Sequence, residues 1–443
     1  MTGFLHHPLV ARLRLGLRAY RDDRRGAVVI LAAVLFPVVI GGLGLWIETG
    51  YWYGMQRQVQ HIADLSAHAA GVRIRAGDSK AQATAAARHI ATQAGFAAAG
   101  TLTVNIPPVS GAKQGSPDAI EVILTERHTR WFTALFAGGQ VALRGRAVTV
   151  IEGDATACLL ALSASANAAV FVTGSTSVSL TGCDIASNSV SATSFAMGGL
   201  GAQLSTGCVH AVGGATPNAS LTLTSCAAVK TNAARARDPY ASLAEPAIIG
   251  ACNSKTVGNN KTLTTLTPTD IHPLGGGLKS MRFCSGFDLR GEVALSPGLY
   301  IIEGGGLTVN GGSINSTTAA KLSGAGVTFY LADPSTEIQL NGNVTLDLAA
   351  PTSGPLSGVL FFGARSATAA SNVINGTSAS VLQGAIYTPA SAIQFSGNSA
   401  NSGGCTQVIG ATITLTGNSA VQASCANAGT RDLWASETVR LAE

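Results

Sequence analysis

The 443-residue sequence is poor in aromatic and charged residues, which make up 5% and 12% of it. So few aromatic side chains argue against exposed aromatic rows on a glycan-binding flank. Clustered cations are also scarce beyond the start of the chain. Residues 1–26 hold six Arg against two Asp, so +4 of the net charge of +5 lies there and the other 417 residues carry +1. A surface that follows nucleic-acid phosphates needs grouped Lys and Arg, so we expect no nucleic-acid partner.

Motifs of catalysis and of cofactor binding are missing too. No Gly-x-Ser-x-Gly, EF-hand or Cys-x-x-Cys occurs, and neither Gly-Gly-Gly run, at 275–277 or 304–306, is directly followed by Lys-Ser/Thr. The residues nearest to a catalytic pattern are two acidic pairs and two histidines: Asp288 with Glu292, Asp333 with Glu337, His210 and His272. None has a recognisable catalytic context. We therefore predict no catalytic residue, cofactor, metal ligand or small-molecule substrate, and a protein that is not an enzyme.

One long apolar run is present, at residues 27–47, with no charge in 21 residues. At about 1.5 Å per residue it spans about 31 Å, the thickness of a bilayer's hydrocarbon core. The run is too long for a signal peptide with a nearby cleavage site, so we predict a retained transmembrane helix. The arginines precede it and none follows before Arg57, which places residues 1–26 in the cytoplasm as a basic tail. The predicted membrane-interface anchors are Arg24, Arg25, Trp46 and Trp52.

All eight cysteines follow this helix, as an oxidising compartment permits. The disulfide candidates are Cys158, Cys183, Cys208, Cys226, Cys252, Cys284, Cys405 and Cys425. Eight cysteines allow 105 pairings. Our best candidates are Cys405–Cys425 and Cys252–Cys284. The even spacing of Cys158, Cys183 and Cys208 also allows bridges, or an internal ladder, between stacked strands.

Two regions follow the apolar run. Residues 48–152 predict a small α+β module, with helices across the run's continuation and across 78–95, and strands at 101–106, 119–125 and 141–151. Residues 131–136 fit a strand or a short helix. In the first helix, Met55, Val59 and Ile62 form a stripe that packs either on partner helices or on the module itself.

Residues 153–430 alternate short apolar pieces with Gly, Asn, Ser and Thr, which is typical of a parallel β-helix. A β-sandwich is the alternative. The stretch from about 230 to 285 is richer in Pro and charge, and we interpret it as an irregular insertion.

The N-terminal region resembles a known family. Arg24, Arg25 and Gly26 precede the apolar run, Glu48 follows it, and then come Gln58 or Gln60 and Asp64. This order and spacing resemble the TadG-like proteins of the Tad (Flp, tight-adherence) pilus system, over about 50 residues that continue to about residue 75. The Gly-rich sequence from 288 to 425 resembles, more loosely, the C-terminal region of such proteins. Leu31 stands where a cleaved prepilin would have Glu, which argues against a pilin subunit.

The resemblance implies an inner-membrane accessory of pilus assembly, single-pass, with its N-terminus in the cytoplasm and its bulk in the periplasm. It would act by protein–protein contacts, with the membrane and other Tad/Flp components as partners. The alternatives are a membrane-tethered adhesin or glycan-binding envelope protein and, third, a β-helix carbohydrate-active enzyme.

Overall fold

The chain folds into two compact units. The computed structural model describes residues 26–199, 201–310, 320–340, 344–376, 380–397, 400–417, 419–422, 425 and 428–443. Unit 1 comprises the described residues up to 74, with 78–150 and 439–443, and unit 2 comprises 75–77 and 151–438. The basic tail 1–25, with Arg24 and Arg25, therefore lies outside the described residues.

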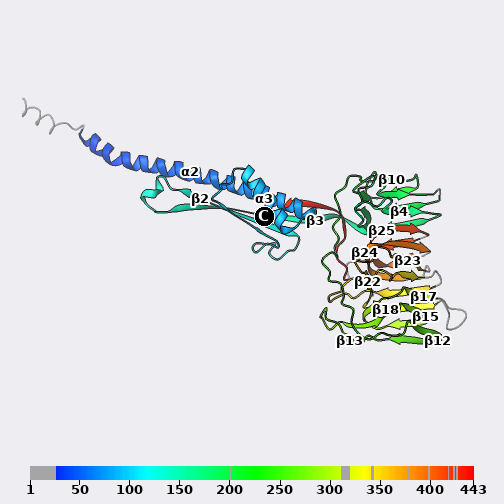
Figure 1. Ribbon diagram of the computed structural model, residues 1–443. Coiled ribbons are helices and arrows are strands. Elements are labelled where there is room, and N and C mark those ends of the chain that lie inside the picture. The colour runs from blue at the N-terminus through cyan, green and yellow to red at the C-terminus, as the bar shows by residue number, and fades with distance from the viewer. Residues whose placement is uncertain are drawn as a thin grey trace, which may run out of the picture. The chain divides into compact units, whose positions relative to one another are not determined.

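Unit 1 is built along one long helix, α2 (Gly26–Arg75) (Figure 1). Its first part carries the apolar run, whose side chains are mostly exposed, and α2 is long and apolar enough to cross a membrane. Farther along, a stripe of small and aliphatic residues is buried: Val59, Ile62, Ala63, Ala67 and Ala70. Val59 and Ile62 of the predicted stripe thus lie in the unit's own core, while Met55 is half-buried.

A short second helix and three antiparallel strands complete unit 1. Helix α3 (Lys80–Gln93) begins at a capping box, in which Ser79 and Gln82 bond each other's backbone N–H, and buries only alanines. Strand β2 (Ala119–Thr129) pairs with β1 (Thr101–Asn105) on one side and with β3 (Gln140–Ala161) on the other. The turn between β2 and β3 contains the 3₁₀ helix η1 (Thr133–Leu135), so the ambiguous segment 131–136 is a short helical turn.

Unit 2 is a stack of short parallel strands, the β-helix-like fold expected from its composition. Near one end, each turn of chain contributes three strands that pair with those of the next turn. These strands are the end of β3, then β4 (Val170–Thr173), β5 (Ser177–Thr181), β6 (Asp184–Ser187), β7 (Phe195–Met197), β8 (Gln203–Thr206), β9 (Val209–Ala211), β10 (Ala215–Thr216) and β11 (Leu221–Leu223). Such pairing of successive turns argues against the alternative β-sandwich.

The second series of turns starts at the opposite end of the stack. Its strands are β12 (Thr256–Leu266), β13 (Asp270–Ile271), β14 (Lys279–Phe283), β15 (Phe287–Leu295), β16 (Gly298–Ile302), β17 (Leu307–Asn310), β18 (Ala320–Ala325), β19 (Val327–Leu331), β20 (Ile338–Leu340), β21 (Val344–Ala349), β22 (Val359–Gly363), β23 (Ser371–Gly376), β24 (Val381–Gly397), β25 (Ala400–Thr416) and β26 (Ser419–Gln422). All their mutual pairings are parallel except that of β13 with β14. Strand β27 (Trp434–Leu441) follows.

The two series meet in the middle of the stack. Strand β25 pairs with β24 on one edge and with β3 and β4 on the other, and β26 pairs with β5. In Figure 1 the orange-red β25 accordingly lies between β4 and β24, while green strands form both ends of the stack, at β10 and at β12. The last strands of the stack therefore close a gap between earlier ones.

The connection between the two series is a strap, residues 231–252, which runs along the stack. Asn188 bonds both the N–H and the C=O of Ala236, and Arg365 donates to the carbonyls of Tyr240, Ala241 and Leu243. The strap's far end is bonded by the Cys252–Cys284 disulfide to the residue that follows β14. The irregular insertion predicted at about 230–285 therefore needs correction. Only its first part lacks regular strands, and β12 to β14 belong to the stack.

The interior of the stack is a continuous apolar core. Aromatic rings lie one above another on successive turns, with centroids 5.7 Å apart for Tyr300 and Phe329 and 5.1 Å apart for Phe329 and Phe361. Val, Leu and Ile from the parallel strands fill the rest. Burial of these alternate residues explains why short apolar pieces separated by small polar ones form this fold.

Candidate functional site

The polar residues that follow the apolar run attach the sheet of unit 1 to α2. Glu48 lies one residue beyond the run, and its side chain is 1% exposed. Its carboxylate accepts hydrogen bonds from the N–H groups of Trp131 and Thr133, at 2.8 and 2.7 Å, and from the Thr133 hydroxyl at 3.0 Å. An acid at the N-terminus of a helical turn pairs N–H groups that have no partner within the turn. Glu48 therefore holds the turn between β2 and β3 against the helix.

Two glutamines on α2 take the place of a neighbouring strand beside β3. The Gln56 Nε2 donates to the Arg144 carbonyl at 2.7 Å. One turn later, the Gln60 amide donates to the Arg146 carbonyl at 2.7 Å and accepts from the Arg146 N–H at 3.1 Å. Four helical residues rise about 6 Å, close to the 6.8 Å that separates alternate residues of a strand, so the two amides match alternate carbonyls of β3.

The same edge of β3 is completed by the last described residues of the chain. Ala442 N–H donates to the Val148 carbonyl at 2.8 Å, and Val148 N–H donates to the Glu443 carbonyl at 2.9 Å. Residues 144, 146 and 148 of β3 are thus all paired, and an edge that could recruit another strand is covered. The helix comes close to this edge because residue 145 is glycine, where a Cβ would lie 2.5 Å from the Val59 carbonyl.

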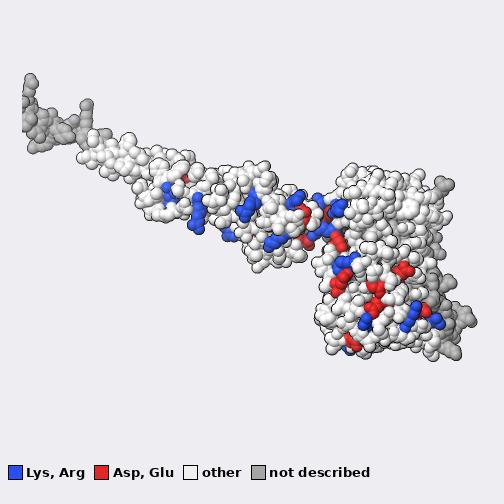
Figure 2. All heavy atoms as spheres, viewed as in Figure 1, with Lys and Arg blue, Asp and Glu red and all other residues white. Residues whose placement is uncertain are grey.

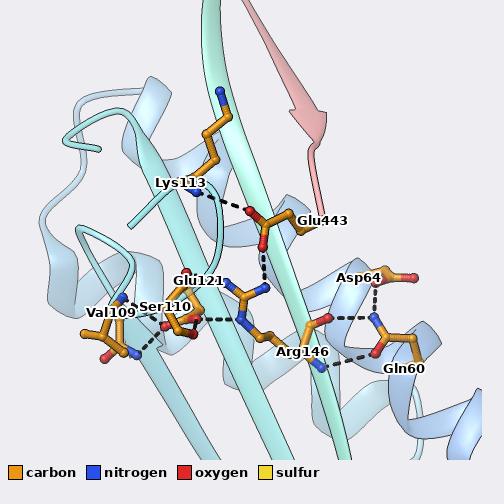
Figure 3. A network of polar contacts seen from close by, with 9 residues as sticks. Gln60, Asp64, Val109, Ser110, Lys113, Glu121, Arg146 and Glu443 are labelled. Atoms are coloured by element: carbon orange, nitrogen blue, oxygen red, sulfur yellow. Dashed lines mark hydrogen bonds and ion pairs between the residues drawn. The ribbon is translucent and has the colours of Figure 1, made fainter. Parts of the chain in front are cut away.

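A buried carboxylate fixes Arg146 on the other side of the strand (Figure 3). Glu121 is fully buried and accepts from Asn105, Val109, Ser110 and the Nε of Arg146, at 2.7–3.2 Å. Burial alone would raise the pKa of Glu121, but these hydrogen bonds outweigh it and lower the pKa to about 2.

Two further carboxylates complete this network. The Glu443 side chain accepts from Arg146 Nη1 at 2.5 Å, and this bond lowers the Glu443 pKa. Asp64 accepts from the Gln60 amide at 2.8 Å and so orients it. Of the residues that carry the family resemblance, Glu48 and Gln60 therefore bond α2 to the sheet, as Gln56 also does, and Asp64 orients Gln60.

Comparison with known proteins supports this reading of the N-terminal region. Residues 26–83 match the family model described as "Putative Flp pilus-assembly TadE/G-like". These residues form a TadE/G-like domain. No curated protein and no solved structure matches the chain.

The TadE/G-like domain contains α2 and the start of α3, and its polar side chains bond to strands that follow it in the sequence. Trp46 of the predicted interface anchors is 78% exposed on α2, and Trp52 is half-buried beneath the Arg130 guanidinium, 5.5 Å from its ring centroid. The sequence pattern did not single out Gln56, Arg146 or the bonds of the 131–136 turn to Glu48. The only signal for the turn was the uncharged run WFTALFAGG at 131–139.

The cysteines that follow the TadE/G-like domain form four disulfides in unit 2. They are Cys158–Cys183, Cys208–Cys226, Cys252–Cys284 and Cys405–Cys425. Two of these pairs are the ones selected from the sequence. Of the three evenly spaced cysteines, Cys158 and Cys183 bridge adjacent turns, whereas Cys208 pairs with Cys226 and forms no ladder with them.

One described cluster in unit 2 has the residue types of a metal site, Asp184, Cys208 and His210, all buried. However, the Cys208 sulfur belongs to a disulfide. The Asp184 carboxylate accepts from the Cys208 N–H at 2.8 Å and contacts His210 Nε2 at 2.9 Å. The three side chains therefore already have partners within the β-helix, and these contacts explain why they lie together.

Three of the acids that came nearest to a catalytic pattern, and the second histidine, also make structural contacts. Asp333 accepts from the N–H groups of Gly304 and Ser335, and Asp288 pairs with Arg290 at 3.4 Å. Glu337 accepts from Gln339, and His272 contacts the Ala247 carbonyl of the strap. These contacts hold turns and neighbouring segments of the stack.

Proposed function

We propose that the protein is a single-pass inner-membrane accessory of Tad/Flp pilus assembly, with its N-terminus in the cytoplasm and both units in the periplasm. It acts by protein–protein contacts, without catalysis, and its partners are other Tad/Flp components. The observation that carries the proposal is the TadE/G-like domain at 26–83, in which the apolar run and the polar residues that hold unit 1 share one helix.

The proposed orientation is supported by charge and by cysteine chemistry. Residues 1–26 carry a net charge of +4, and no Lys or Arg occurs from Ala27 to Gln56, an asymmetry that favours a cytoplasmic N-terminus. The four disulfides of unit 2 fit an oxidising compartment.

The glycan-binding alternative has less support in unit 2. A shallow hollow of about 300 Å³ is lined by strands β5, β8 and β11, with Ser177, Ser179, Gln203 and Thr222 among its residues. Its hydroxyl-rich lining contains no aromatic side chain. Moreover, none of the aromatic side chains of unit 2 that the structure describes is more than half exposed. Such a surface suits contact with another protein at least as well as contact with a sugar.

Two experiments test the proposal. Alkaline phosphatase, which is active only after export, is fused after residue 443, and we expect an active fusion in the membrane fraction. Deletion of the gene in its host should reduce the number of surface pili seen by electron microscopy, and the full-length gene should restore them. An inactive fusion would overturn the orientation, and normal piliation of the deletion strain would overturn the role in assembly.

A further inference from the structure

The turn between β2 and β3 ends in an exposed apolar surface. We name residues 131–137 the aromatic tip. Its large side chains are 41–84% exposed: Trp131 54%, Phe132 41%, Leu135 84% and Phe136 77%. No charged residue occurs between Arg130 and Arg144. Four large apolar side chains grouped on one short turn are unusual on a surface that only water contacts.

The aromatic tip lies beside the apolar run of α2. The Phe132 ring is packed where residue 44 is glycine, and a Cβ there would lie 2.5 Å from that ring. Trp131 stacks on Tyr51, with ring centroids 4.8 Å apart. Gly44 is three residues, or about 4.5 Å, inside the end of the apolar run. The tip therefore overlaps the stretch of helix that would be at the edge of the hydrocarbon core.

Most backbone N–H groups of the aromatic tip have partners within unit 1, as a lipid environment favours. Glu48 accepts from the N–H groups of Trp131 and Thr133. The N–H of Leu135 donates to the Phe132 carbonyl at 3.3 Å, and those of Phe136 and Ala137 donate to the Thr133 carbonyl. Unpaired backbone groups cost several kcal/mol in lipid, so a turn with internal partners can enter where an open loop cannot.

Basic side chains flank the aromatic tip on the two strands that it connects. Arg127 on β2 and Arg144 on β3 are exposed, whereas the acids Glu48, Glu121 and Glu126 are at most 4% exposed. Figure 2 shows the start of α2 as an uncharged surface, with blue basic side chains appearing farther along unit 1. In a membrane, the acyl chains favour apolar side chains and the lipid phosphates next to them favour cations, which is the order found here.

We propose that the aromatic tip inserts into the lipid layer beside α2 and gives unit 1 a second, interfacial contact with acyl chains. This inference rests on the proposed anchoring by α2. Because the tip continues the apolar surface of a membrane-spanning helix at the same level, lipid is the occupant that this surface fits. Two points of attachment restrict the rotation of unit 1 about the helix, and Glu48 positions the second point.

A depth measurement on the full-length protein in lipid nanodiscs tests the inference. Single cysteines are introduced by Phe136→Cys, Val109→Cys and Val39→Cys and labelled with an environment-sensitive NBD probe. The native cysteines are all in disulfides and do not react. Val109 is a matched control, since it is 59% exposed in the same unit but adjoins Glu121, eight strand residues from the end of β2. Val39, in the apolar run, reports whether α2 is inserted.

We expect a nitroxide-labelled phospholipid to lower the fluorescence at residue 136 about twofold, as at residue 39, with little effect at 109. Quenching at 39 alone would overturn the aromatic tip as a lipid contact. A blue-shifted but unquenched probe at 136 would also overturn it, in favour of a contact with protein. An unquenched probe at residue 39 would instead show that the anchoring itself fails.

Discussion

The two units are stabilised by contacts of different kinds. In unit 1, polar contacts that are each made once hold the sheet to α2, through Glu48 and Gln60, and join β2 to β3, through the Glu121–Arg146 pair. In unit 2, parallel pairing and stacked rings repeat from turn to turn, and four disulfides add to them. A repeated contact can be lost at one turn and retained at the next. Unit 1 should therefore be sensitive to pH and to single polar substitutions, and unit 2 to redox state and packing.

Within unit 2, the strap differs from the stacked strands because its contacts do not repeat from turn to turn. The largest loss of stability is therefore expected from a substitution in the strap. Tyr240 is fully buried, its hydroxyl donates to Gln407 at 3.2 Å, and it accepts from the Arg431 N–H at 3.1 Å. We expect Tyr240→Ala to lower the stability of unit 2 by about 3–5 kcal/mol, as for other large aromatic truncations. Hydrogen exchange followed by mass spectrometry, in increasing urea, reports each unit separately.

The matched control for this substitution is Tyr240→Phe, which keeps the ring and removes the hydrogen bonds. It should cost about 1 kcal/mol. If the two variants cost the same, the contribution of Tyr240 would be polar and not one of packing. If exchange in unit 1 changed as much as in unit 2, the separation into independently stabilised units would be wrong.

The next largest effect should come from the disulfide that joins the strap to Cys284, directly after β14. Cys252–Cys284 closes a segment with a sequence separation of 32 residues. Replacing both cysteines by serine should destabilise unit 2 by about 2–4 kcal/mol, because the unfolded chain gains freedom. Since all eight cysteines lie in unit 2, reducing agent should leave the urea transition of unit 1 unchanged. A shift of that transition on reduction would contradict the contrast.

Low pH should affect unit 1 through Glu121. Its pKa is about 2 in the folded protein against 4.5 in a free side chain, so its ionised form stabilises the fold above pH 4.5. That stability is lost as pH falls from about 4.5 toward 2, and the loss reaches about 2 kcal/mol at pH 3. Glu121→Gln cannot titrate, and unit 1 of this variant should show a flatter dependence of stability on pH. Equal slopes for variant and wild type would assign the acid sensitivity to other groups.

The sequence predicted most where structure is determined locally. The helix predicted across 78–95 is α3, which begins at the Ser79–Gln82 capping box, and the strand predicted at 119–125 lies in β2, because caps and two-residue periods depend on neighbours in sequence. Closure of the stack between β25 and β3 could not be foreseen, since strands of similar composition can pair with many others. The strap resembled a loop because its Pro and charged residues bond to distant turns of the stack.

Only part of the candidate site could be predicted from the sequence, because the residues on α2 bond to partners that are distant in sequence. The family resemblance singled out Glu48 and, as one of two glutamines, Gln60, but could not name their partners, which lie on the turn before β3 and on β3 itself. Nothing in a single sequence relates Gln60 to the backbone of Arg146, 86 positions away. The resemblance also did not indicate which of the two glutamines, Gln58 or Gln60, bonds to the sheet.

The smallest expected effect decides between those two glutamines. Gln60→Ala removes the partner of both the Arg146 N–H and its carbonyl, and should cost unit 1 about 1–2 kcal/mol, because part-buried backbone groups lose their hydrogen bonds. Gln58→Ala is the matched control, since Gln58 is exposed and lies on the same helix. Exchange of the Arg146 amide should speed up in the first variant and stay unchanged in the second. Faster exchange in both would mean that α2 as a whole, and not this one amide, protects the edge of β3.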